Sequence, residues 1–291
     1  MEFFRNNIIF ICYRLRASKV CRSLRTAVDT IGTCFNIVDL ILYDCKLNLM
    51  LDGIEILYTK TANGSSNANH NGQKYIIDRK NFVDRALKDL KIVSKHAQNI
   101  KFANNTKYRR NIVSSLIEFF KTQKCVHVKE IGLHKFSFEQ VLTILPCFDA
   151  KQLKNIDLSG IKSIYQFERI TDLKQWQNAE ELRIFIPFSK ISSTIIVHLF
   201  HFQCFSIHYV GKVSVQTAIQ MREDLLRRST FQSCEITFEK SKSNPIELAK
   251  VFKLDYAGGN EFKIEFSNCN NKFDISLKEF SWCFVLNVER L

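Results

Sequence analysis

The sequence predicts an α/β protein in which an N-terminal helix and a small antiparallel β-sheet precede a leucine-rich-repeat-like α/β solenoid with terminal β-strands. Three observations carry this prediction: periodicity changes from β-type to helical near residue 79, an apolar pattern recurs between the later helices, and β-type alternation returns after residue 260. Only 9 Gly and 3 Pro occur in 291 residues, which favours dense regular structure. We expect three segments, at residues 1–32, 33–78 and 79–291.

The small antiparallel sheet is predicted from short β-prone runs over residues 36–78. Asp52 and Gly53 separate two of these runs, and an Asp-Gly pair in that position is a strong hairpin signal. Residues 61–72 are rich in Asn, Ser and Gly, so we expect a flexible hairpin tip there.

Helices are expected from residue 79 onward, where apolar residues recur at intervals of three and four. Capping signals mark three helix starts, because a Ser or Asn precedes a Gln or Glu by three residues. These pairs are Ser137 with Gln140, Ser163 with Gln166, and Asn244 with Glu247.

An internal repeat alternates with these helices. Its pattern is apolar-x-x-apolar-x-apolar, and the central residues of successive copies are 31, 25, 26, 23 and 29 positions apart. A strand of this type with one helix per unit is typical of leucine-rich repeats. The alternative is an ordinary α/β domain, because the consensus is loose. The copies are Ala97/Ile100/Phe102, Val128/Ile131/Leu133, Leu153/Ile156/Leu158, Ala179/Leu182/Ile184, Phe202/Phe205/Ile207 and Phe231/Cys234/Ile236. The strands expected after residue 260 would cap this array.

No motif for catalysis or cofactor binding occurs in the sequence. The nucleophile elbow, the phosphate-binding loop and the dinucleotide fingerprint are all missing, so we predict no enzyme activity, no catalytic residue and no cofactor. His198, His201, Cys204 and His208 are spaced closely enough to suggest zinc ligands. Their position in an apolar helix-to-strand turn gives the alternative of a packing role, and we predict no metal site.

Cysteine usage and hydropathy indicate an intracellular protein, cytoplasmic or nuclear. The ten cysteines are spread along the chain and none forms a C-x-x-C pair, as expected for reduced thiols. The longest apolar runs, residues 8–13 and 194–200, are too short to span a bilayer, so we expect no membrane association.

The positive charge is concentrated in two segments. The chain has a formal net charge of +13, of which residues 79–130 carry +9 and residues 1–30 carry +4. Residues 79–130 could contact phosphates or an acidic protein, or could form a solvated helix face. No RNA-binding motif accompanies it, so nucleic acid is the less favoured partner. The candidate basic patch consists of Lys88, Lys91, Lys95, Arg109 and Arg110.

The segment from residue 19 to residue 29, KVCRSLRTAVD, resembles the last helix of the F-box in nematode F-box proteins. The remainder resembles the FTH domain that follows the F-box in that family. The matching stretches are LDG at 51–53, QKCVHVK at 123–129, ILP at 144–146, FERIT at 167–171, VHLFHF at 197–202, RSTFQSC at 228–234, SNPIELA at 243–249 and DYAGG at 255–259.

This resemblance implies a non-enzymatic substrate receptor that recruits a target protein to a Skp/cullin–RING ubiquitin ligase. Val20, Leu24 and Val28 recur on one helix face, and the resemblance implies that they contact the Skp-type adaptor. Residues 1–18 contain no Leu-Pro start, so the F-box is expected to be truncated, which weakens the expectation of adaptor binding. Two alternatives are a binder of nucleic acid or acidic protein through residues 79–130, and a family remnant with a lost F-box.

The target protein would contact exposed strand positions of the repeats. In each unit these are the positions between the apolar ones, which point away from the core. The candidate target-binding face is Asn155, Asp157, Arg183 and Glu235.

Overall fold

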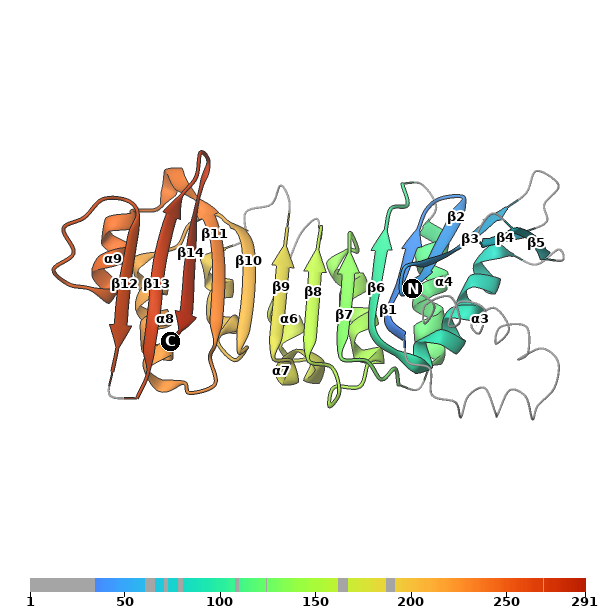
Figure 1. Cartoon of the computed structure of the whole chain (residues 1–291), viewed down its shortest axis with the longest axis horizontal. Helices are drawn as coiled ribbons and strands as arrows, with labels where there is room; N and C mark the ends of the chain where they lie inside the picture. Colours follow the sequence, from blue (N-terminus) through green and yellow to red (C-terminus); the bar gives the residue numbers. More distant parts are fainter. Residues whose placement is uncertain are drawn as a thin grey trace, which may run out of the picture. The chain divides into compact units, whose positions relative to one another are not determined.

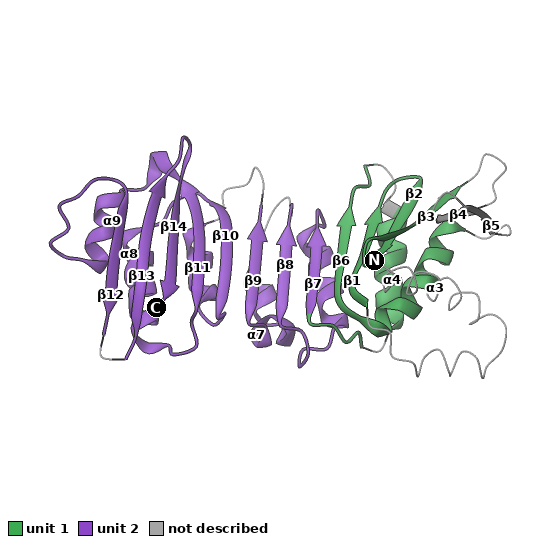
Figure 2. Ribbon diagram, in the orientation of Figure 1, with its two compact units in different colours: residues 1–129 green, residues 130–291 purple. Residues whose placement is uncertain are grey.

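The computed structural model describes residues 35–60, 66–70, 73–77, 81–107, 110–123, 125–161, 167–186, 192–268 and 270–291. It divides into two compact units, Met1–Lys129 (unit 1) and Glu130–Leu291 (unit 2), coloured separately in Figure 2. Each unit is mixed α/β, with strands and helices as Figure 1 labels them. The helix expected within residues 1–32 lies outside the described residues.

Unit 1 is a sheet with the strand order β6-β1-β2-β3-β4-β5. Strands β1 and β6 pair in parallel, and the other neighbours are antiparallel. The expected boundary after residue 78 falls inside this unit, because β1 pairs with β6 along its length. Periodicity along the chain cannot reveal such a distant pairing. The elements are β1 (Phe35–Leu42), β2 (Lys46–Leu51), β3 (Ile54–Lys60), β4 (Ser66–His70), β5 (Gln73–Ile77), α3 (Phe82–Val93), η1 (Ser94–His96), β6 (Ala97–Asn104) and α4 (Arg110–Thr122).

The hairpin predicted at Asp52 and Gly53 is confirmed, and it joins β2 to β3. Both residues have positive φ, 48° and 86°, as the tight turns of two-residue hairpins require. The Asp52 carboxylate also accepts hydrogen bonds from the backbone of Asn36 (3.2 Å) and Ile37 (2.7 Å), which fixes the start of β1. The prediction of a flexible tip over residues 61–72 was wrong in part, because strand β4 lies within that range. Its polar sequence has no apolar alternation that could have marked it.

A buried polar cluster joins α3 to β3 in unit 1. The Tyr58 hydroxyl donates a hydrogen bond to the Asp89 carboxylate at 2.8 Å, and the Arg85 guanidinium donates to the same oxygen at 2.9 Å. Asp89 and Tyr58 are both buried. Because a buried carboxylate without partners is costly, this cluster fixes the helix against the sheet.

The free energy of unfolding is expected to fall as the pH rises above about 10, the ordinary pKa of tyrosine. Burial raises the pKa of Tyr58 well above that value, and the Asp89 carboxylate adds to the shift. The unfolded chain therefore releases this proton at a lower pH than the folded chain does, so alkaline pH favours unfolding. Urea unfolding at several alkaline pH values should show a smaller decline for Tyr58→Phe than for the unchanged protein. Equal declines would contradict the prediction.

Unit 2 is a sheet with the strand order β12-β13-β14-β11-β10-β9-β8-β7. Strands β7 to β11 are neighbours in chain order and pair in parallel, and β14, β13 and β12 continue the sheet in antiparallel fashion. The elements are β7 (Glu130–His134), α5 (Phe138–Ile144), η2 (Leu145–Cys147), β8 (Asn155–Ser159), α6 (Glu168–Thr171), α7 (Lys174–Asn178), β9 (Glu181–Phe185), η3 (Ser193–Leu199), β10 (Cys204–Val210), α8 (Val215–Arg227), β11 (Ser233–Glu239), η4 (Lys240–Lys242), α9 (Pro245–Phe252), β12 (Phe262–Ser267), β13 (Lys272–Glu279) and β14 (Cys283–Arg290).

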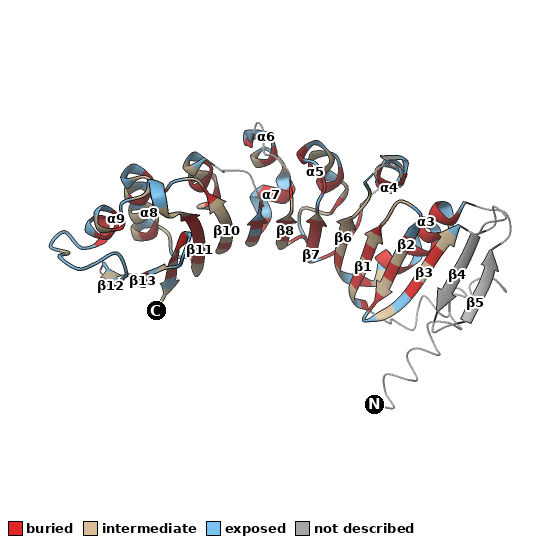
Figure 3. Ribbon diagram, turned by 90° about the horizontal axis from the view of Figure 1, so that it is seen from above, coloured by how far each residue is buried: buried red, intermediate tan, exposed pale blue. Residues whose placement is uncertain are grey.

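The helices of unit 2 lie on one face of its sheet (Figure 3). Apolar strand residues point toward them and form the core. The strands predicted from the apolar repeat are present, since its last two residues lie buried in each of β7 to β11, and the terminal strands are present as β12 to β14. Within unit 2, the same pattern of main-chain hydrogen bonds also recurs between the residues that precede successive parallel strands. They run from Glu180 and Glu181 to the Lys154 carbonyl, from Gln203 and Cys204 to that of Glu180, and from Gln232 and Ser233 to that of Gln203.

Two of the predicted helix starts are confirmed. Ser137 and Gln140 form a reciprocal capping box at α5, and the Asn244 side chain accepts hydrogen bonds from Ile246 and Glu247 at α9. The pair Ser163 and Gln166 lies outside the described residues.

None of the helices in the described part of the chain has both the length and the apolar character that crossing a lipid bilayer requires. Cys45, Cys204, Cys234 and Cys283 carry reduced thiols, and the last two are buried. Burial raises the pKa of both buried thiols, so they are poor nucleophiles.

Candidate functional site

The face of the unit 2 sheet that carries none of the described helices (Figure 3) is the candidate functional site, and we call it the open face. On β7 to β11 and β14, the side chains that alternate with the buried ones point toward this face. Strand register arranges them in three rows across the sheet, except that the pairing of β10 with β11 shifts after Ile207, where the hydrogen bond between His208 and Thr237 joins the two strands in the third row. The first row is Glu130, Asn155, Glu181, Cys204, Ser233 and Glu289; the second is Gly132, Asp157, Arg183, Ser206, Glu235 and Asn287; the third is His134, Ser159, Phe185, His208, Thr237 and Val285.

The four residues of the predicted target-binding face all lie on the open face. Asp157 and Arg183 are direct neighbours across β8 and β9, and Asn155 lies one row away. Glu235 lies in the same row as Arg183, two strands along. Side chains along a β-strand point alternately to its two faces, and the sequence predicts one common surface for these residues because of that alternation.

A hollow of about 340 Å³ lies on the open face over β9, β10, β11 and β14. Two predicted residues, Arg183 and Glu235, line it. The prediction from the sequence missed five further polar residues of this hollow, which are Glu181, Ser206, Ser233, Asn287 and Glu289. Asn287 and Glu289 belong to β14, and no local pattern shows that this terminal strand pairs with β11.

His208 lies at the centre of a hydrogen-bonded cluster beside the hollow. Its Nε2 lies 2.9 Å from the Ser206 hydroxyl and 3.7 Å from the Glu235 carboxylate, and its Nδ1 lies 3.0 Å from the Thr237 hydroxyl. In a serine–histidine–acid relay the carboxylate binds the nitrogen that faces away from the serine. Here serine and carboxylate approach the same nitrogen, so the cluster has the geometry of a polar surface and not of that relay.

Three aromatic side chains form one edge of the open face, and we call them the aromatic edge: Phe185, Tyr209 and Trp282. The Tyr209 and Trp282 rings are stacked at 5.3 Å, and Phe185 meets Tyr209 edge-on at 5.4 Å. Tyr209 has a φ of 69°, next to a register shift in β10. This left-handed backbone is uncommon for a tyrosine and directs its ring toward Trp282. Trp282 and Phe185 are 54% and 39% exposed, so the edge is open to contact.

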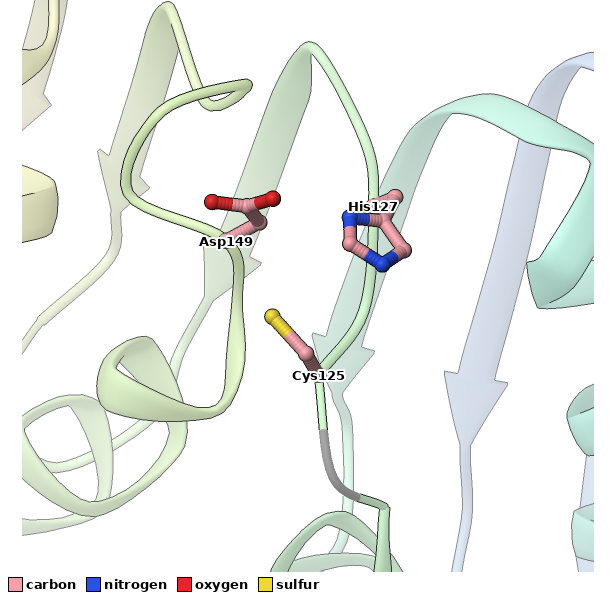
Figure 4. A group of neighbouring side chains, drawn as sticks. All are labelled: Cys125, His127 and Asp149. Atoms are coloured by element: carbon pink, nitrogen blue, oxygen red, sulfur yellow. The ribbon is translucent and has the colours of Figure 1, made fainter.

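The four residues weighed as zinc ligands have separate surroundings. The Nε2 atom of His201 lies 2.9 Å from the Trp176 carbonyl, and burial lowers the pKa of its imidazole. Cys204 and His208 lie on the open face, and the four side chains do not converge on one point among the described residues. Figure 4 draws a different trio. Its exposed Cys125 and His127 belong to unit 1, whereas Asp149 belongs to unit 2 and accepts a hydrogen bond from the Lys151 backbone. Two exposed ligands from one unit do not form a closed metal site.

The predicted basic patch is described only in part. Lys88 and Lys91 are exposed on α3, and Lys95 is exposed on η1. Arg109 lies outside the described residues, and the side chain of Arg110, at the start of α4, is likewise not described. Val20, Leu24 and Val28, implied as adaptor contacts, also lie outside the described residues.

The FTH domain family matches residues 110–255, which is half of the chain. The chain belongs to the FTH domain family. The matched region begins at α4 in unit 1 and continues through α9 in unit 2, so it includes the strands β7 to β11 that carry most of the open face. Strand β14 and Trp282 lie beyond it. No curated protein and no solved structure matches the chain.

Proposed function

We propose that this protein is a non-enzymatic receptor that binds a target protein and presents it to a Skp/cullin–RING ubiquitin ligase. The observation that carries the proposal is the FTH match, because this domain is associated with the F-box of nematode F-box proteins. The F-box-like segment at residues 19–29 would contact the Skp-type adaptor, and the open face of unit 2 would bind the target. Such a protein would act inside the cell, in the cytoplasm or nucleus.

We further propose that β7 to β11 form a leucine-rich-repeat-like array. Two observations support this proposal: the strands pair in parallel in chain order, and the same main-chain hydrogen bonds recur between the residues that precede successive strands. Solenoid repeats present many side chains on one extended sheet face, which suits recognition of a protein surface better than binding of a small molecule.

A second candidate function uses the lysines of unit 1. Lys88, Lys91 and Lys95 are exposed along one helical stretch, and they could bind an acidic protein or nucleic acid. Replacing all three by glutamine would remove that binding and leave the ligase role unchanged.

Adaptor binding is tested by purifying the tagged full chain with a recombinant Skp-type adaptor. We expect the adaptor to be retained by the unchanged chain and lost with Leu24→Glu, which places a charge on the apolar face implied to bind it. Arg25→Ala, one residue away, is the matched control and should retain the adaptor. If the unchanged chain does not retain the adaptor, the proposed role in a ubiquitin ligase is wrong. That result would favour the alternative that the protein is a family remnant with a lost F-box.

A further inference from the structure

The open face of unit 2 is acidic, although the whole chain has a net charge of +13. Its three rows on β7 to β11 and β14 carry one guanidinium, that of Arg183, against five carboxylates, and the next two strands add Lys278 and Lys263 against Asp274 and Glu265. Neither Glu181 nor Glu289 is ion-paired within the described chain, and Glu235 is paired only with His208. The five carboxylates belong to Glu130, Asp157, Glu181, Glu235 and Glu289.

The aromatic edge lies on the same face as these carboxylates, and His208 connects it to Glu235. Phe185 lies on β9 four residues beyond Glu181, on the same face of the strand. Phe185 also contacts His208 at 6.0 Å between ring centroids, and His208 lies beside Glu235. Carboxylates and aromatic ring faces therefore lie next to each other on one surface.

We infer that the open face binds an extended, Lys- and Arg-rich segment of a partner protein. Carboxylates attract the cationic groups, and the exposed ring of Trp282, which stacks on the partly buried Tyr209, favours a guanidinium or ammonium above it. Side chains two apart in an extended segment are about 6.7 Å apart, which is also the spacing between the rows along each strand. A segment running along the strands would place alternate side chains over the first row, the second row and the aromatic edge.

The same chemistry disfavours a phosphate-bearing partner on this face. Carboxylates repel phosphates, and the described lysines of the candidate basic patch lie in unit 1, on α3 and η1. The inference rests on the proposed role of unit 2 as the target-binding part, but it does not depend on adaptor binding.

The test uses the full chain and a fluorescein-labelled Arg-Ser repeat peptide of about 12 residues, long enough to cross the face when extended. Fluorescence anisotropy should show binding that weakens as salt is added. The triple variant E181Q/E235Q/E289Q should weaken binding about tenfold or more. The matched control E168Q/E223Q/E247Q changes the net charge equally through exposed residues of α6, α8 and α9, and it should leave binding unchanged.

The aromatic edge is tested by Trp282→Ala, which should weaken peptide binding about threefold to tenfold. Leu254→Ala is its control, because Leu254 is 89% exposed and lies away from the open face, between α9 and β12. The inference is overturned if the unchanged chain does not bind the peptide, or if both triple variants weaken it equally. It is also overturned if an oligonucleotide binds and the open-face variant abolishes that binding. Peptide binding without adaptor retention would overturn the ligase role alone, and the reverse result would overturn this inference alone.

Discussion

Trp176→Ala is expected to lower the free energy of unfolding of unit 2 by about 3–5 kcal/mol. Trp176 lies on α7 and is 1% exposed. Its indole meets the rings of Phe167 and Phe202 edge-on, at 5.3 Å and 5.0 Å between centroids. Alanine would leave a cavity between side chains that come from two different segments, the residues before α6 and those before β10, so the surroundings cannot collapse without moving both segments.

Two further variants, one at Trp176 and one at Trp282, separate cavity formation from the other effects of losing a tryptophan. The buried Trp176 Nε1 has no hydrogen-bond partner among the described residues, so Trp176→Phe removes an unsatisfied donor while keeping an aromatic ring. We expect it to cost less than about 1.5 kcal/mol. Trp282→Ala replaces the other tryptophan of the chain, which is half exposed, and should change stability by less than about 1 kcal/mol.

The chain contains 2 Trp, so each alanine variant keeps one tryptophan as a fluorescent probe of urea unfolding. Far-UV circular dichroism of the same samples reports whether the whole chain unfolds together. Equal destabilisation by Trp176→Ala and Trp282→Ala would contradict the assignment of Trp176 to the core.

The strands β6 to β11 and the predicted face could be read from the sequence because their signals are local. Ile156 and Leu158 alternate with Asn155 and Asp157, and this alternation alone decides which side chains reach solvent. The hairpin at Asp52 and the capping box at Ser137 were equally accessible, since each depends on a few adjacent residues.

The rest depended on pairings between distant segments. Nothing near Phe35 indicates that β1 pairs with β6, and nothing near Cys283 indicates that β14 pairs with β11. Glu289 and Trp282 therefore joined the candidate site only when the strand order was known. The net charge of +13 also gave no sign of the excess of carboxylates on the open face, because residues 1–30 and 79–130 account for all of that charge.

Arg228→Met is expected to destabilise unit 2 by about 2–4 kcal/mol, somewhat less than the loss expected for a fully buried ion pair. The Arg228 guanidinium donates to the Phe202 carbonyl at 2.7 Å and forms an ion pair with Asp224 at 2.7 Å. It also lies over the Phe231 ring, at 5.1 Å from the centroid. Arg228 thus ties the end of α8 to the residues that precede β10 and β11, which methionine cannot do.

The pH dependence of this loss identifies its cause. Burial raises the pKa of the Asp224 carboxyl, and the charge of Arg228 opposes that shift. Without Arg228 the pKa of Asp224 would rise further, so the folded variant would hold a proton that the unfolded chain releases near pH 4. The destabilisation measured by urea unfolding should therefore grow as the pH is raised from about 4 to neutrality.

The double variant D224N/R228M tests whether the unpaired Asp224 carboxylate causes the loss of stability. It removes the unpaired carboxylate together with its partner, and it should recover about 1–2 kcal/mol of the loss at neutral pH while abolishing the pH dependence. A double variant as unstable as Arg228→Met at every pH would show that the bond to the Phe202 carbonyl, and not the ion pair, accounts for the stability that Arg228 contributes.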